Sequence, residues 1–323
     1  MHKGEFVDYI LQKSQKKPLL ESVEVFAPAN IALVKYWGKR NVELNLPTAS
    51  SLSISLGDRG TKTRLSFSGD KKNHLIFNGE KIDRNTPFFC RVDAFFSLFK
   101  KGFQIETTNT IPTGAGLASS ASAFASFTLA LDQLLGWHLD KSDLSKIARL
   151  GSGSATRSLW DGFVKWEKGV REDGMDSYGV PLKNSLDELV VGLLIFDQEQ
   201  KSISSREAME ITKNSSPLYS LWPDITEKAL IKMQEALDLQ NFDQLGQIAE
   251  KHALIMHSTM LTADPSICYS SPKTIEAMQK VWELRKKGLP LYFTQDAGPN
   301  LKLLFQKKNL GVVQQYFLGL SVI

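Results

Sequence analysis

Residues 111–123 read Ile111-Pro-Thr-Gly-Ala-Gly-Leu-Ala-Ser-Ser-Ala-Ser-Ala123, and this stretch indicates the fold more strongly than any other in the chain. Gly114 and Gly116 allow the backbone to turn and to approach a ligand with no Cβ in the way. Ser119 and Ser120 then stand at the start of a predicted helix, whose free N–H groups and positive dipole end attract anions. The sequence predicts a phosphate-binding loop or, alternatively, a glycine loop capping an alanine-rich buried helix.

Two familiar nucleotide motifs do not describe this loop. No Gly-Lys-Ser/Thr sequence follows the glycines, so it is not a Walker loop, and the glycine spacing is not that of the dinucleotide fingerprint. A phosphate site here would therefore rest on backbone N–H groups and serine hydroxyls.

The composition of the 323 residues, 42% hydrophobic and 23% charged, is that of an ordinary globular protein. A length above about 300 residues favours two domains. No apolar run is long enough for a membrane-spanning helix, and the polar N-terminus lacks the apolar core of a secretory signal. Cys90 and Cys268 lie far apart, which makes a reducing cytoplasm the expected compartment. The net charge of +4 suits either a solvated surface or an enzyme of anionic substrates.

Periodicity predicts an α/β (α+β) chain in two parts. In the first part, strands are expected at 23–26, 31–37, 51–56, 61–67 and 74–77, and helices at 87–101, 119–135 and 140–150. In the second part, strands are expected at 189–196, 289–295 and 301–305, and helices at 205–214, 222–239, 242–260, 272–287 and near 311–318. We therefore expect domains at 1–184 and 185–323.

Three further motifs carry chemically useful side chains, each with a simpler alternative. Residues 27–40 end in Lys-Tyr-Trp-Gly-Lys-Arg, which suits an anion pocket or the solvent face of an edge strand. In Gly-Ser-Gly-Ser-Ala-Thr-Arg-Ser, at 151–158, Arg157 can fork onto a carboxylate or phosphate, or lie at the surface of a turn. In Thr-Gln-Asp-Ala-Gly-Pro-Asn, at 294–300, Asp296 either serves catalysis or caps the turn.

The loop resembles the second motif of the GHMP kinase family, Pro-x-x-x-Gly-Leu-x-Ser-Ser-Ala. Its positions here are Pro112, Gly116, Leu117, Ser119, Ser120 and Ala121. Taken in order over residues 26–300, the four motifs are similar to those of the diphosphomevalonate decarboxylase family. The resemblance implies a two-domain GHMP fold with a ribosomal-S5-like N-terminal half and a ferredoxin-like C-terminal half.

The same resemblance implies an activity. ATP phosphorylates the 3-hydroxyl of (R)-5-diphosphomevalonate, and loss of phosphate and CO₂ then leaves isopentenyl diphosphate. A cytoplasmic homodimer is expected, with a small-molecule substrate, no nucleic-acid partner and no membrane.

The resemblance also assigns roles to single residues. Asp296 corresponds to the catalytic aspartate that orients or deprotonates the hydroxyl, Lys39 to the lysine beside it, and Arg157 to the arginine that grips the substrate carboxylate. Substrate contacts are implied for Tyr36, Lys39, Ser152, Ser154 and Arg157, and at the diphosphate tail for Ser205 and Arg206. ATP contacts are implied for Pro112, Gly114, Gly116, Leu117, Ser119 and Ser120. Mg²⁺ is expected through the ATP phosphates, with Ser119 or Ser120 as candidate ligands.

Three positions depart from the family pattern, and alternatives remain. Ala49 stands where asparagine is common, Thr156 where cysteine or serine is usual, and Asp161 where glycine is usual. One alternative is a kinase of the same superfamily that stops at the 3-phosphate, and another is a decarboxylase acting on the monophosphate. A nucleic-acid-binding protein is a third, suggested by the basic charge balance.

Overall fold

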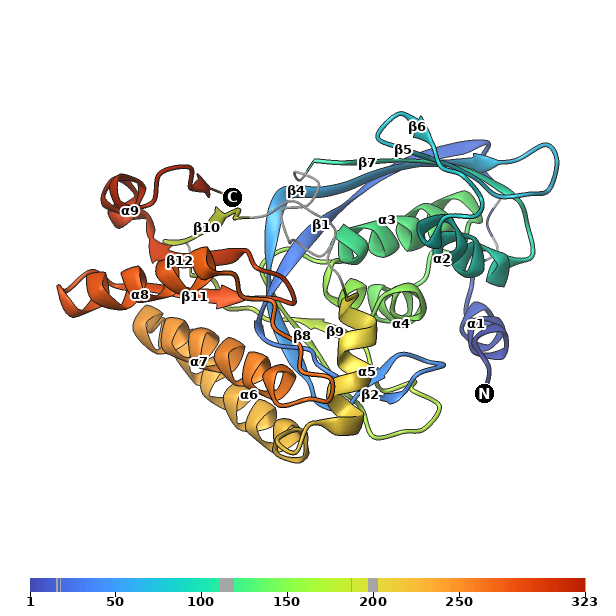
Figure 1. Cartoon of the computed structure of the whole chain (residues 1–323). Coiled ribbons are helices and arrows are strands. Elements are labelled where there is room, and N and C mark those ends of the chain that lie inside the picture. Colours follow the sequence, from blue (N-terminus) through green and yellow to red (C-terminus); the bar gives the residue numbers. More distant parts are fainter. Residues whose placement is uncertain (16, 18, 111–118, 187, 197–202, 323) are drawn as a thin grey trace.

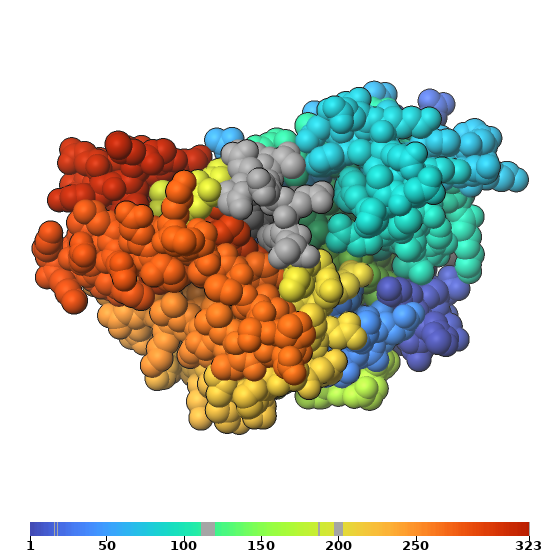
Figure 2. All heavy atoms as spheres, viewed as in Figure 1, coloured from blue at the N-terminus to red at the C-terminus, as the bar shows by residue number. Residues whose placement is uncertain are grey.

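The computed structural model describes residues 1–15, 17, 19–110, 119–186, 188–196 and 203–322. Figure 1 shows two β-sheets, each covered by helices, and a mixed α/β architecture in two parts as expected from the sequence. Figure 2 shows the early residues, in blue and cyan, on the opposite side of the molecule from the last ones, in orange and red. A small hairpin of β2 (Lys39–Asn41) and β3 (Leu46–Pro47) stands apart from both sheets.

The first sheet is built on one long pair of strands. β1 (Ser22–Val34) runs antiparallel along one edge of β4 (Ser51–Phe67), and β7 and β8 pair with its other edge. The remaining strands are β5 (His74–Phe77), β6 (Glu80–Lys81), β7 (Phe103–Asn109), β8 (Phe163–Trp166) and β9 (Gly179–Pro181). Their order is β6-β5-β7-β4-β8-β9, and among the described strands of this sheet only the neighbours β5 and β7 run parallel.

The strands expected at 51–56 and 61–67 form one strand, β4, which approaches β1 very closely at Gly60. A Cβ at Gly60 would lie 2.1 Å from the carbonyl oxygen of Ala27, so this approach requires glycine. The register of β1 shifts at the same level, between Pro28 and Asn30. Beyond this irregularity β1 continues to the residues of the predicted site.

Helices cover one face of the first sheet. They are α1 (Lys3–Leu11), α2 (Pro87–Phe96), α3 (Ser119–Leu134) and α4 (Lys141–Gly151). The small residues of α3 let it pack directly on β1 and β4. Two hydroxyl pairs fix its register against β4: Ser122 with Thr61, and Ser126 with Thr63, each at 2.7 Å. This packing sets the position of the N-terminal end of α3, where the predicted phosphate loop joins it.

Two short features test the sequence predictions closely. The turn after 74–77 is confirmed as a hairpin, in which Asn78 and Gly79 have φ values of 52° and 85°. The expected N-cap at Asp140 is also confirmed, because its carboxylate accepts a hydrogen bond from the Asp143 N–H at 2.8 Å. Helix α1 was not expected, since its apolar positions are few.

The second sheet is entirely antiparallel, in the order β11-β12-β10-β13. Its strands are β10 (Leu189–Leu194), β11 (Leu291–Gln295), β12 (Leu301–Gln306) and β13 (Ser321–Val322). The helices of this half are α5 (Ser205–Ser215), α6 (Trp222–Asp238), α7 (Phe242–Leu261), α8 (Pro272–Lys286) and α9 (Leu310–Tyr316). Residues of β11 alternate between the two faces of the sheet: Tyr292 packs in the cluster with α6 and α7, whereas Leu291 and Phe293 pack with α8.

The two halves share a hydrophobic core. Ile31 and Leu33 of β1 belong to the same buried cluster as Leu237 of α6 and Leu245 of α7. Figure 1 shows α6 and α7 side by side below the second sheet, and both helices contact β1. The first sheet ends at Pro181 and the second begins at Leu189. The domain boundary after residue 184 stays a prediction.

In the part of the chain that the structure describes, no helix has both the length and the apolar character needed to cross a membrane.

Candidate active site

Each carboxylate oxygen of Asp296 is paired with the ammonium group of a different lysine. It follows the last residue of β11, and its side chain is 27% exposed. Its Oδ1 lies 2.7 Å from Nζ of Lys35, and its Oδ2 lies 3.0 Å from Nζ of Lys302. Both lysines are buried, so the sequence alternative of a simple turn cap does not describe this aspartate.

Burial and neighbouring charges shift the pKa values of Asp296 and Lys35 in opposite directions. Burial by itself raises the pKa of Asp296, but the ammonium groups of Lys302 and Lys35 outweigh it and hold that pKa well below its usual range. Burial also lowers the pKa of Lys35 to about 8, against the opposing attraction of Asp296. At neutral pH the carboxylate is ionised, and it accepts hydrogen bonds readily while binding a proton weakly.

The expected contact between Lys39 and Asp296 is wrong, because Lys35 takes that place. Lys35 directly follows β1 and is buried between the two halves, whereas Lys39 begins the separate β2–β3 hairpin. The pKa of Lys39 is lowered to about 8 by burial first, and then by the neighbouring charges of Arg206 and Lys3. Lys39 therefore lies near the residue predicted to meet the diphosphate tail, and its role in substrate binding stays a prediction.

Arg157 is buried, with 2% of its surface exposed, which excludes the alternative of a surface arginine. It closes a short 3₁₀ turn, Gly153–Arg157, that follows α4. Its Nε donates to Oγ of Ser53 at 3.0 Å, its NH1 donates to Ser51, and it faces the Trp166 ring at 5.8 Å. Burial lowers its pKa to about 10, and no ion pair with a carboxylate is formed within the described chain. A buried guanidinium held by neutral hydroxyls is well suited to receive an anion.

The serines of the Gly-Ser-Gly-Ser motif adjoin the start of α3. Ser152 Oγ lies 3.0 Å from Ser154 Oγ and 3.3 Å from Ser120 Oγ. A residue predicted to meet ATP and two predicted to meet the substrate are thus neighbours.

Tyr36 supplies a buried polar atom to the site. Its hydroxyl is buried and unpaired among the described residues, and its ring packs edge-on against Trp166 at 4.7 Å. Gly153 is required beside it, since a Cβ there would lie 2.9 Å from the Tyr36 ring and 2.8 Å from the Trp166 ring. An unpaired buried hydroxyl costs free energy unless a ligand binds it.

The remaining predicted residues are less enclosed. Ser205 and Arg206 open helix α5 and are exposed, and Ser204 caps that helix by accepting from the Glu207 N–H at 3.2 Å. Ser119 is the first residue of α3. The predicted ATP contacts Pro112, Gly114, Gly116 and Leu117 lie outside the described residues.

Sequence reasoning placed Lys35 in the anion-pocket motif but did not identify it as the partner of Asp296, and it missed Lys302 and His252. Nδ1 of His252 accepts a hydrogen bond from the backbone N–H of Lys35 at 3.0 Å, and Nε2 lies 3.2 Å from Oγ1 of Thr226. Burial, and then Lys35, lower the pKa of His252 to about 3, so this imidazole is neutral. The available signal was a lysine in each of two apolar strand regions, Leu-Val-Lys and Leu-Lys-Leu-Leu-Phe.

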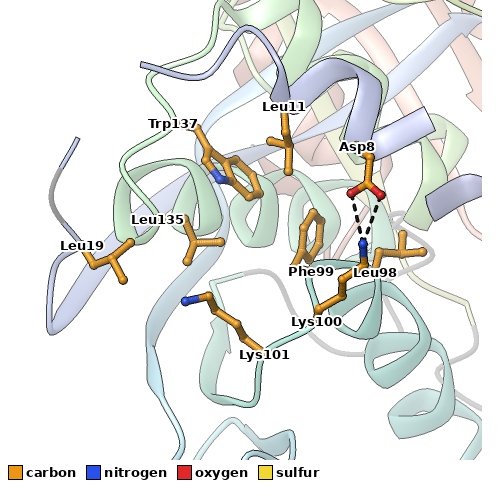
Figure 3. A pocket seen from close by; sticks show the side chains of 9 residues that line it. All are labelled: Asp8, Leu11, Leu19, Leu98, Phe99, Lys100, Lys101, Leu135 and Trp137. Carbon is orange, nitrogen blue, oxygen red and sulfur yellow. Dashed lines mark hydrogen bonds and ion pairs between the residues drawn. The ribbon is translucent and has the colours of Figure 1, made fainter. Parts of the chain in front are cut away.

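A cavity of about 240 Å³ lies elsewhere, between α1 and the segments near residues 100 and 136. Figure 3 shows its mostly apolar lining, including Leu11, Phe99 and Trp137, with Asp8 paired to Lys100 at its edge. None of the predicted site residues lines it, so it is separate from the group around Asp296.

Comparisons with known proteins identify the family of the chain. Residues 27–179 match the family model of the diphosphomevalonate decarboxylase-like N-terminal domain, and residues 191–320 match that of the mevalonate 5-diphosphate decarboxylase C-terminal domain. Diphosphomevalonate decarboxylase of Debaryomyces hansenii is 33% identical over 324 residues, which cover 91% of this chain and 83% of that protein.

Solved structures give the same result. Mevalonate diphosphate decarboxylase of Staphylococcus aureus aligns with a TM-score of 0.87 and 34% identity, covering 94% of this chain and 98% of that one. The complex of MDDEF with MVAPP, AMPPCP and magnesium aligns with a TM-score of 0.86 and 38% identity, covering 93% and 95%. The expected two-domain GHMP-type fold class is confirmed, and the chain belongs to the diphosphomevalonate decarboxylase family.

Proposed function

We propose that the chain catalyses the ATP-dependent decarboxylation of (R)-5-diphosphomevalonate to isopentenyl diphosphate, in the mevalonate pathway of isoprenoid biosynthesis. The observation that carries this proposal is the carboxylate of Asp296, which is paired with Lys35 and lies near the buried Arg157, a guanidinium that has no carboxylate partner among the described residues. Such a set provides an acceptor for a hydroxyl and a cation for a carboxylate, the two groups carried by the adjacent carbons of the substrate between which the double bond forms.

Asp296 would accept a hydrogen bond from the 3-hydroxyl and orient its oxygen toward the terminal phosphate of ATP. Transfer of that phosphate to the hydroxyl releases ADP and one proton, and catalysis of such transfers is mainly positioning and charge stabilisation. Departure of the 3-phosphate then takes the C–O bonding electrons. The electrons of the breaking bond to the carboxylate form the double bond, and CO₂ leaves.

Arg157 would hold the substrate carboxylate from the start. A bidentate pair keeps that group oriented and excludes water from it. The Tyr36 hydroxyl, unpaired among the described residues, and the hydroxyls of Ser152 and Ser154 would complete the substrate contacts. Lys39 and Arg206 would meet the diphosphate.

The start of α3 fits a nucleotide phosphate. This helix has 16 residues, so its N-terminal N–H groups and dipole favour an anion, and Ser120 adds a hydroxyl in its first turn. The comparable complex of MDDEF contains AMPPCP and magnesium. When bound, Mg²⁺ would neutralise phosphate charge, with Ser119 and Ser120 as its candidate protein ligands.

Assembly and compartment are part of the same proposal. The family resemblance supports a cytoplasmic homodimer acting on a small molecule. Sedimentation equilibrium of the full chain tests the assembly, with a mass of twice 36.1 kDa expected.

The decisive assay measures ADP and CO₂ together, with mevalonate, its 5-phosphate and its 5-diphosphate as separate substrates. We expect stoichiometric ADP and CO₂ from the diphosphate when ATP and Mg²⁺ are present. ADP without CO₂ would make the protein a kinase that stops at the 3-phosphate. CO₂ mainly from the 5-phosphate would make it a decarboxylase of the monophosphate.

A further inference from the structure

The second lysine on Asp296 has no assigned role. Lys302 is 1% exposed and is the second residue of β12, between Leu301 and Leu303. Burying an ammonium in an apolar sheet is costly unless the charge is paired. Its Nζ lies 3.0 Å from Oδ2 of Asp296, and this ion pair offsets much of that cost.

The register of the second sheet explains how Lys302 reaches the carboxylate. Lys302 is directly opposite Thr294 of β11, two residues before Asp296. Side chains alternate along β12, so Lys302 shares a face with Leu304 and points away from Leu303. Leu304 packs in the cluster that includes β1, whereas Leu303 packs with α8. Lys302 therefore lies on the face of the sheet that is turned toward Lys35.

The two lysines hold Asp296 from different parts of the molecule. Lys302 belongs to the same sheet as the strand that ends before Asp296, and Lys35 follows a strand of the first sheet. The Lys302 pair is thus internal to the C-terminal half, and the Lys35 pair joins the halves.

We propose that Lys302 is a positioning residue, which anchors Oδ2 of Asp296 to the second sheet so that Oδ1 and Lys35 face the substrate hydroxyl. This proposal rests on the catalytic role given to Asp296 above. Lys302 acts through that carboxylate and does not itself meet the reacting atoms.

Other charged and titratable groups around the pair define its response to pH. Arg157 adds a positive charge that lowers the pKa of Lys35, and Lys302 does the same. His252 and His257 also face the pair, but burial lowers their pKa values to about 3 and about 4, so they stay neutral near pH 7. Among the described residues, the charges that act on Lys35 at neutral pH are therefore those of Asp296, Lys302 and Arg157.

Removing the Lys302 charge should change the pKa of Lys35 in a predictable direction. Lys35 has a pKa of about 8 while Lys302 repels its proton, and without Lys302 that pKa moves up. Loss of the Lys35 proton removes the ion pair with Oδ1 of Asp296, so kcat should fall as pH rises through the pKa of Lys35. Because that pKa is higher without Lys302, the alkaline limb of the kcat profile should move to higher pH in Lys302→Met.

The central experiment compares the full-length wild type with Lys302→Met, which is similar in size but uncharged, and Lys302→Arg, which keeps the charge. We expect Lys302→Met to lower kcat by roughly 10- to 100-fold, since small displacements of a catalytic group have effects of this size. KM for 5-diphosphomevalonate and the affinity for ATP should change by less than about threefold, because neither ligand binds Lys302 directly. Lys302→Arg should recover most of kcat.

A double-mutant cycle with Asp296→Asn separates positioning from other roles. If Lys302 acts only through Asp296, the double variant Lys302→Met/Asp296→Asn should turn over no more slowly than Asp296→Asn alone. Additive losses, or wild-type kcat in folded Lys302→Met, would overturn the proposal. Should Lys302→Met not fold, Lys302→Gln provides the same neutral test, with the pH profile as its readout. Near-normal turnover of Asp296→Asn would instead remove the catalytic role of Asp296, whatever Lys302 does.

Discussion

The surroundings of Asp296 and those of Lys39 contrast in how their charges are balanced. Asp296 is held by Lys35 and Lys302, each buried and each bonded to its own oxygen. Lys39 lies among like charges, since Arg206 and Lys3 lower its pKa, and Glu210 opposes them. The first group is organised before any substrate arrives. The repulsion around Lys39 is relieved when an anion binds there. The Asp296 group therefore suits the chemical step, and the surroundings of Lys39 suit substrate binding.

The largest effect is expected from Asp296→Asn. Asparagine keeps the size of the side chain and can still accept a hydrogen bond, but it removes the negative charge between two ammonium groups. We expect kcat to fall by about 10²–10⁴-fold, the usual contribution of such a carboxylate. Turnover and nucleotide binding should be measured in one folded preparation, because joint loss of both would indicate a collapsed site.

Arg157→Leu should be the next most damaging. Loss of a buried charge pair costs on the order of 2–5 kcal/mol, here through the substrate carboxylate. The effect should appear in kcat/KM, with ATP affinity retained, and Arg157→Lys should restore it only partly because lysine lacks the planar fork. Steady-state kinetics with 5-diphosphomevalonate give the answer, and a full-activity Arg157→Leu enzyme would contradict the assignment.

Lys39→Met should have the smallest effect of the three and a different signature. We expect KM for the diphosphate substrate to rise about tenfold, from loss of one charged hydrogen bond, with kcat almost unchanged. The pKa of Lys39 is about 8, so wild-type KM should rise as pH passes that value, and this rise should vanish in Lys39→Met. A large drop in kcat in this variant would bring Lys39 back to the chemical step.

The family and the main elements could be read from the sequence because their signals are local. Motif order gave the fold class, and the hairpin at Asn78-Gly79 and the cap at Asp140 follow from turn and cap chemistry. Helix α1 was missed because its three buried residues, Phe6, Val7 and Ile10, form a narrow apolar stripe that only the packed structure explains.

Long-range pairing was the part that sequence could not supply. Both Lys35 and Lys39 belong to the same quoted motif, and nothing local distinguishes which one reaches a carboxylate about 260 residues later. Strand β1 ends at Val34, so the next residue, Lys35, lies between the two halves and is the lysine that reaches Asp296. Lys302 was missed because its partner is defined by strand register, and the burial of Arg157 depends on Ser51 and Ser53 of a distant strand.

Because β1, α6 and α7 share one hydrophobic core, the two halves should not be stable as separate fragments. A chain split between β9 and β10 would leave one fragment with Ile31 and Leu33 uncovered, and the other with the facing side of two helices uncovered. Each fragment alone would then be prone to aggregate, since contiguous exposed apolar patches favour association. Produced together, the two fragments should reassociate without a covalent link, and decarboxylation would return with the assembled pair, because Lys35 and Asp296 lie on different fragments.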